Sequence, residues 1–103
     1  MNDREVMLSD LAQLTLKEHG EEEQLWIIIE EMGELAQSIS HFRRSRCNDY
    51  HVAKEISDVM CCLFQLSKII GVDIVKRVLD QTIRENFEKL GVDYMSAIED
   101  DLL

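Results

Sequence analysis

The sequence predicts an all-α fold, an antiparallel four-helix bundle. Apolar residues recur three and four positions apart through most of the chain, which is the period of an α-helix. The 103 residues include no proline and only four glycines, and no segment shows the apolar–polar alternation of a strand. A chain of this length fits a single domain spanning residues 1–103. Since so small a domain buries limited surface, we expect an obligate oligomer.

Two helices are predicted in the first half of the chain. The first covers residues 3 to about 18, with Asp3 as its cap and His19-Gly20 as its stop. The second covers residues 21 to about 44, and its three leading glutamates suit the positive end of a helix dipole. The run from Leu25 to Ile29 is apolar all round, so we expect burial on two sides, the second against another copy of the chain.

Two further helices follow a short connection. Asn48 or Asp49 is the predicted cap of the third helix. The triplets Gly71-Val72-Asp73 and Gly91-Val92-Asp93 each combine a helix stop with a new cap, so a fourth helix is predicted over residues 74 to 90. Residues 94–103 are expected to form at most a short helix. The predicted buried stripe of the third helix is Val52, Ile56, Val59, Leu63, Leu66 and Ile70.

Two acidic pairs with equal spacing lie on the second and third predicted helices. Glu31 and Glu34 are three residues apart, as are Glu55 and Asp58. This spacing puts both carboxylates of a pair on one helix face. Both pairs border apolar positions, where an unpaired carboxylate is unfavourable. Four carboxylates that converge from two antiparallel helices are best neutralised by Mg²⁺ or a similar hard cation, whereas solvated surface charges are the alternative interpretation.

Other candidate residues have two interpretations each. Gly33 stands in mid-helix, where its missing side chain leaves room either for a ligand or for a close helix crossing. Trp26 is either a base-stacking residue or part of a core or interface. One basic patch is either a phosphate contact or a solvated helix end; it consists of Arg43, Arg44 and Arg46, with His41 and Lys54 nearby.

The sequence Glu30-Glu31-Met32-Gly33-Glu34, followed after 20 residues by Glu55-Ile56-Ser57-Asp58, resembles a family signature. It is similar to the EExxE…ExxD pattern of the MazG-like, all-α nucleoside triphosphate pyrophosphohydrolases, over roughly residues 20 to 90. The resemblance implies Mg²⁺-dependent cleavage, with Mn²⁺ as a substitute, of (deoxy)nucleoside triphosphates to a monophosphate and pyrophosphate. It further implies a homodimer or tetramer that cleans or balances nucleotide pools.

The resemblance also assigns roles to individual residues. Glu31, Glu34, Glu55 and Asp58 would be the metal ligands, and Glu30 would orient or deprotonate the attacking water. In several family members the fourth helix adds a lysine, an asparagine four residues later and a further basic residue. Asn86 and Lys89 fit the later part of this pattern, but Thr82 stands where the lysine belongs, and Arg84 is its candidate substitute. The predicted substrate-binding residues are Trp26, Arg84, Asn86 and Lys89.

Composition limits the other function classes. The net charge of −10 repels phosphate backbones, so general binding of nucleic acid is not expected. The longest apolar run is too short to span a membrane. The three cysteines form no disulfide or zinc pattern, which suits a cytoplasmic protein with reduced thiols. The alternative functions are a non-enzymatic helical interaction module and a nucleotide sensor that retains the fold.

Overall fold

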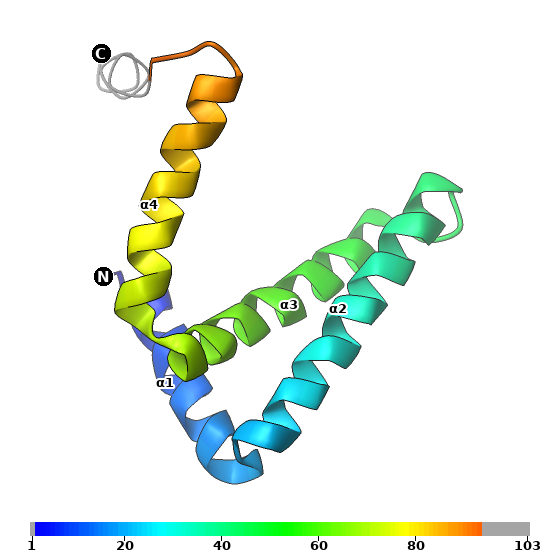
Figure 1. The fold of residues 1–103 in the computed structure, drawn as a ribbon. Coiled ribbons are helices and arrows are strands. Elements are labelled where there is room, and N and C mark those ends of the chain that lie inside the picture. The colour runs from blue at the N-terminus through cyan, green and yellow to red at the C-terminus, as the bar shows by residue number, and fades with distance from the viewer. Residues whose placement is uncertain (1, 94–103) are drawn as a thin grey trace. The chain divides into compact units, whose positions relative to one another are not determined.

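The computed structural model describes residues 2–93, and within this range the secondary structure is entirely helical. The elements are α1 (Asp3–His19), α2 (Glu21–Arg43), α3 (Asp49–Ile70) and α4 (Val72–Lys89) (Figure 1). The all-α prediction is therefore confirmed. None of these helices is both long and apolar enough to cross a membrane. The short terminal helix considered for residues 94–103 lies outside the described residues.

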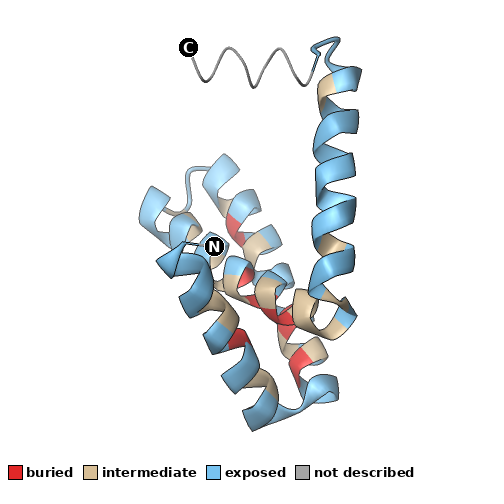
Figure 2. Ribbon diagram, turned by 90° about the vertical axis from the view of Figure 1, so that its left-hand side faces the viewer, coloured by how far each residue is buried: buried red, intermediate tan, exposed pale blue. Residues whose placement is uncertain are grey.

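The chain divides into two compact units, and the first contains α1, α2 and α3. In Figure 1, α2 and α3 run side by side in opposite directions, and α1 packs against both. The buried positions of this unit face its interior (Figure 2). They combine apolar residues with three polar ones; the full set is Ala12, Gln24, Ile28, Ser38, Val59, Cys62 and Gln65. The predicted four-helix packing, single domain and oligomer stay predictions.

The N-terminal cap of α1 lies one residue before the predicted cap. The backbone N–H of Glu5 donates to Asn2 Oδ1 at 2.8 Å, so Asn2 is the cap and Asp3 is the first helical residue. Asparagine and aspartate cap equally well, and only the geometry decides between neighbours. Gly20 ends α1 as predicted, since its N–H donates to the Leu16 carbonyl at 2.8 Å with φ at 81°. The same residue starts α2, because its carbonyl accepts from the N–H of Gln24 at 3.0 Å.

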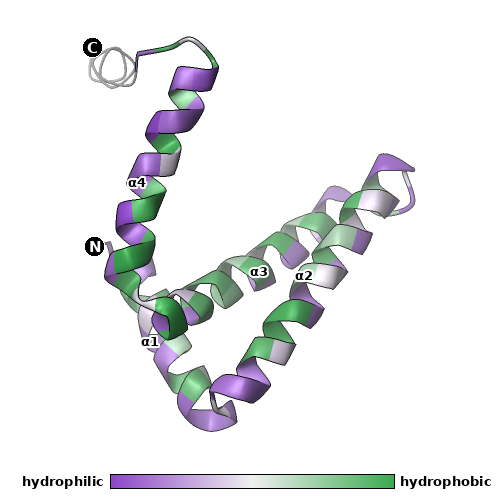
Figure 3. Ribbon diagram, viewed as in Figure 1, coloured by the Kyte–Doolittle hydropathy of each residue, from purple (hydrophilic) through white to green (hydrophobic). Residues whose placement is uncertain are grey.

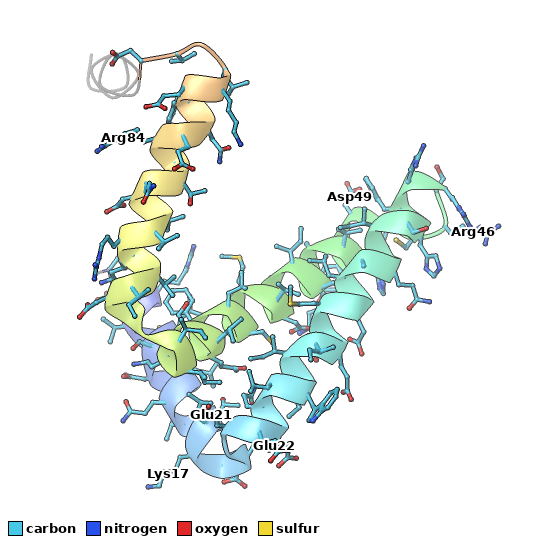
Figure 4. The ribbon with its side chains drawn as sticks, viewed as in Figure 1. Lys17, Glu21, Glu22, Arg46, Asp49 and Arg84 are labelled. Atoms are coloured by element: carbon cyan, nitrogen blue, oxygen red, sulfur yellow. The ribbon has the colours of Figure 1, made fainter. Side chains whose placement is uncertain are left out.

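The connection between α2 and α3 is closed by a Schellman motif. The N–H groups of Ser45 and Arg46 donate to the carbonyls of Phe42 and His41, at 3.0 and 2.8 Å. Ser45 takes the left-handed position of this motif with φ at 58°, where glycine is the usual residue. Asn48 then caps α3, because its Oδ1 accepts from the His51 N–H at 2.9 Å. Figure 4 shows Arg46 in this connection and Asp49 at the start of α3.

Helix α4 begins at Val72, two residues before the predicted start. The carbonyl of Gly71 accepts from the Val75 N–H at 3.1 Å, so Gly71 is the cap and Asp73 lies in the first turn. Gly71 has φ at 126°, a conformation that favours glycine, and it is the single residue between the end of α3 and the start of α4. The predicted stop at Gly91 is confirmed, since the Val92 N–H donates to the Phe87 carbonyl at 3.0 Å. No residue from Val72 to Lys89 is buried.

The buried face of α3 differs from the predicted stripe. Val59 is buried and Val52 and Leu66 are half-buried, as expected, but Ile56, Leu63 and Ile70 are exposed. Their places inside are taken by Cys62 and Gln65. The prediction was wrong because α3 packs against α1 and α2 along a face rotated away from its most apolar residues. Figure 3 shows that both α2 and α3 carry many apolar residues.

The apolar run on α2 is buried on one side only. Ile28 is buried and Leu25 and Ile27 are half-buried, whereas Trp26 and Ile29 are exposed. The first unit therefore covers the inner side of the run, and the expected second cover stays a prediction.

Candidate metal site between α2 and α3

The antiparallel packing of α2 on α3 brings acidic residues from both helices together. Oxygen atoms of Glu31, Glu34 and Glu55 all lie within 4.8 Å of one another. We call these three residues the acid cluster. Glu31 and Glu55 are half-buried, and Glu34 is exposed. Three of the four predicted ligands thus share one site, although they come from helices that the sequence separates by a connection.

Two oxygens of the acid cluster lack hydrogen-bond partners. Glu31 Oε2 and Glu55 Oε2 are buried, and neither accepts a hydrogen bond from any group within residues 2–93. A buried polar atom without a partner is unfavourable, so such atoms need a cation or a donor. Carboxylate oxygens in this number and spacing fit a hard divalent cation such as Mg²⁺.

The titration of Glu31 reflects the crowding of negative charge. Burial raises the pKa of Glu31, and the carboxylates of Glu34, Asp58 and Glu55 raise it further. A hydrogen bond with Glu34 also favours the protonated form. In the absence of a cation, the site therefore favours uptake of a proton, which is the simplest way to reduce the repulsion.

Asp58 lies near the acid cluster but has a partner of its own. Its Oδ1 accepts from Lys54 Nζ at 2.6 Å, one helical turn away on α3. Asp58 is not part of the group of three oxygen atoms, yet its charge acts on Glu31. Lys54 consequently competes with any cation for this carboxylate. The sequence signal for this pair was the spacing of four between an acid and a base.

Cys62 is a buried, neutral residue of α3 near enough to Glu31 to be affected by its charge. It is buried, and burial raises the pKa of its thiol to about 11, with the charge of Glu31 adding to the effect. The thiol stays protonated at neutral pH, so it is neither an activated nucleophile nor a ready metal ligand. Its predicted role as a small core residue is confirmed, while Cys61 is only half-buried.

The outer surface of α2 beside the acid cluster is open. A Cβ atom added to Gly33 would meet no atom within 4 Å, so neither α1 nor α3 crosses α2 closely there. Glu30 is exposed on the same helix. Trp26, one turn before Glu30, is 62% exposed, which rules out a core position within the first unit. Room for a ligand or a partner remains at this surface.

The basic residues that are candidates for phosphate contacts lie in two separate parts of the chain. Arg43 and Arg44 line a shallow hollow on α2 with Ala36, Ile39 and Ser40. Arg84, labelled in Figure 4, lies on α4 with Asn86 and Lys89, and all three are exposed. The predicted phosphate and ribose contacts of these residues stay predictions.

Sequence reasoning missed the buried glutamines of the helix interface. Gln24 and Gln65 are buried and joined by a hydrogen bond from Gln24 Nε2 to Gln65 Oε1. Glutamine is usually exposed, so its type gave no signal. The burial of Gln24 could have been inferred from its spacing, because Gln24 stands two turns before Glu31 on the same face of α2.

Comparisons with models of protein families, with curated proteins and with solved structures found no match for this chain. The fold and site thus define an all-α protein with an acid cluster shared between two antiparallel helices.

Proposed function

We propose that this chain is a magnesium-dependent, MazG-like nucleoside triphosphate pyrophosphohydrolase. The reaction would cleave (deoxy)nucleoside triphosphates between the α- and β-phosphates and yield a monophosphate and pyrophosphate. The proposal is carried by one observation above all. Three carboxylates from two helices converge within 4.8 Å, and two of their oxygens are buried without a partner among residues 2–93. The EExxE…ExxD resemblance supplies the reaction type.

The acid cluster has the donor chemistry for the proposed cation. Glu31 and Glu55 would bind through their unpartnered oxygens, and Glu34 would complete the group from the exposed side. Asp58 would join on release from Lys54. When bound, Mg²⁺ supplies charge neutralisation at the phosphates and a water of lowered pKa.

The remaining roles belong to residues around the acid cluster. Glu30 is exposed beside Glu31 and would accept the proton of the attacking water. Gly33 leaves open the space that a Cβ atom would fill, which suits the approach of a triphosphate. Trp26 is exposed one turn before Glu30, where it would stack on the base. Arg84, Asn86 and Lys89 would contact phosphate or ribose, in keeping with the family resemblance.

We also propose a homodimer or tetramer with a four-helix, MazG-like bundle. Large apolar side chains remain exposed on α2 and α3, and a second copy is the expected cover. The exposed set on these two helices is Trp26, Ile29, Met32, Ile39, Phe42, Tyr50, Ile56, Met60, Leu63 and Ile70. This same surface favours the second candidate function, a helical interaction module that recognises another protein.

The direct experiment is a panel of ribo- and deoxyribonucleoside triphosphates with pyrophosphate release as the readout. We expect release from at least one triphosphate with Mg²⁺ and none after chelation of the metal. Isothermal titration with Mg²⁺ and a non-hydrolysable deoxynucleotide separates the alternatives. A sensor would bind both without turnover, and an interaction module would bind neither; either result would contradict the proposed enzyme.

A further inference from the structure

Gln24 on α2 and Gln65 on α3 form a buried polar contact between these helices. The two residues are 1% and 6% exposed, and Gln24 Nε2 donates to Gln65 Oε1. The other amide atom of Gln24, Oε1, has no hydrogen-bond partner among the residues that the structure describes. The contact is therefore incompletely satisfied on the α2 side.

Stability alone does not account for this pair. Two buried amides that share one hydrogen bond gain little net free energy, and an unsatisfied buried oxygen is unfavourable. An apolar pair of similar size would pack without that penalty. Buried polar pairs between helices are best known for fixing one alignment, because every other alignment leaves both groups unpaired.

The alignment that Gln24 and Gln65 set is also the alignment of the acidic residues. Glu34 lies ten residues after Gln24, and Glu55 lies ten residues before Gln65. Along antiparallel helices, equal steps from one facing pair lead to two residues at the same level of the interface, and these stay face to face when the step is close to a whole number of turns. By the same rule, steps of seven residues bring Glu31 opposite Asp58. The glutamine contact and the acid cluster thus belong to one register.

Charge repulsion opposes this register. Carboxylate oxygens of Glu31, Glu34 and Glu55 all lie within 4.8 Å of one another, so these groups repel one another when they are ionised. A displacement of one helical turn, about 5.4 Å, would exceed the 4.8 Å span of the acid cluster and disperse it. Near the other end of α2, the connection is held to the helix by Cys47 Sγ, which donates to the Ser38 carbonyl at 3.6 Å. The end away from that connection is the one that Gln24 and Gln65 secure.

We infer that Gln24 and Gln65 are positioning residues, whose hydrogen bond holds α2 and α3 in the register that assembles the acid cluster against its own repulsion. The part of this inference that concerns metal affinity rests on the proposed function. The part that concerns the register does not, because it can be measured without metal or nucleotide.

The test compares two replacements of opposite effect on stability. In Gln24→Leu/Gln65→Leu the apolar contact remains and the hydrogen bond is lost. In Gln65→Glu the side chain keeps its length, and a carboxylate oxygen can still accept the hydrogen bond from Gln24. The buried charge of the glutamate lowers the stability of this variant. Ser38→Ala is the matched control, since Ser38 is buried on the same helix and its Oγ has no partner among residues 2–93. Nuclear Overhauser effects between the side chains of Glu34 and Glu55 report the register, and titration with Mn²⁺ reports metal affinity.

We expect the double leucine variant to stay helical, to lose the Glu34–Glu55 contact and to bind Mn²⁺ at least about tenfold more weakly. Gln65→Glu should be less stable than the wild type but should keep the Glu34–Glu55 contact and the affinity for Mn²⁺. Ser38→Ala should keep the contact, the affinity and the stability. A purely structural role would give the opposite order, with affinity following stability.

A folded leucine variant that keeps the Glu34–Glu55 contact overturns the inference. If that variant fails to fold, loss of the contact in helical Gln65→Glu overturns it instead. Failure of the wild-type protein to bind Mn²⁺ would remove the proposed function and leave the register measurement to decide the inference.

Discussion

Glu31 and Glu55 belong to different helices, yet each has one buried carboxylate oxygen without a hydrogen-bond partner among residues 2–93, and the two carboxylates lie within 4.8 Å. The chain accepts an electrostatic penalty at this place, because both groups repel each other and the neighbouring acids. Such an arrangement is understandable if a divalent cation occupies the space between them.

Glu34→Gln should abolish pyrophosphate release, with a loss of at least about a hundredfold, because an amide is a poorer ligand than a carboxylate and carries no charge. Asp58→Asn should do the same. Both proteins should remain folded, as judged by circular dichroism. Glu22→Gln is the matched control, because Glu22 is an exposed acid of the same helix, seen in Figure 4 at its start. Full activity in Glu34→Gln, or a similar loss in Glu22→Gln, would contradict the ligand assignment.

Glu31→Gln should stabilise the metal-free protein at pH 7, by roughly 0.5 kcal/mol, the size of a like-charge penalty on a helix. The pKa of Glu31 is raised in the folded state, so its proton is held more tightly than in the unfolded chain. The contribution of Glu31 to stability is therefore fully present when the pH is below its pKa in the unfolded chain. It is lost as the pH rises through its pKa in the folded state. Chemical denaturation between pH 4 and 8 should show that the free energy of unfolding falls less steeply with rising pH in the variant than in the wild type. A less stable variant at pH 7 would count against repulsion in the acid cluster.

Lys54→Gln should strengthen Mg²⁺ binding about threefold, because it frees the Asp58 carboxylate from its ion pair. Isothermal titration measures the change. Lys17→Gln removes an exposed positive charge from the end of α1 and should leave the affinity unchanged. Weaker binding in Lys54→Gln would mean that the lysine supports the site rather than competing with the cation.

Ser45→Gly should stabilise the protein by about 0.5–1 kcal/mol, since Ser45 has a φ of 58° and glycine adopts this left-handed conformation without a steric penalty. The free energy of unfolding in urea is the readout. Ser40→Gly, an exposed position inside α2, should have the reverse effect of similar size. Equal effects at both positions would show that the connection is not held in the Schellman motif.

The helix ends and the pairing of the acids could largely be predicted from the sequence, because they depend on local chemistry. Gly20 and Gly91 end helices where glycine should, and the spacing of three puts Glu31 and Glu34 on one face. The capping of α1 by Asn2 rather than Asp3 depends on one hydrogen bond that neighbouring residues could equally have made.

The buried face of α3 could not be predicted in the same way, because it depends on where α1 and α2 pack. Periodicity identified an apolar stripe that included Ile56 and Leu63, but the helix buries Cys62 and Gln65 instead. Gln24 was missed for a related reason, since its burial depends on a partner 41 residues away. The half-burial of Glu31 likewise follows from helix packing and not from its own sequence context.

Gly33→Ala tests the open surface beside the acid cluster. Alanine should stabilise α2 by about 1 kcal/mol, because its Cβ would meet no atom within 4 Å and its helix propensity is higher. Gly71→Ala is the contrasting variant, since a φ of 126° makes any side chain there unfavourable. If the surface receives the triphosphate, Gly33→Ala should also raise the KM for substrate. Thermal unfolding and steady-state kinetics measure the two effects.

The most direct measurement is anomalous diffraction from crystals grown with Mn²⁺ in place of Mg²⁺. The account predicts one or more ions at the acid cluster, bound by oxygens of Glu31, Glu34 and Glu55 at distances near the 2.0–2.1 Å typical of magnesium, with Asp58 drawn away from Lys54. Crystals in which these carboxylates face bulk solvent, with no anomalous signal between α2 and α3 at a saturating concentration of the ion, would contradict it.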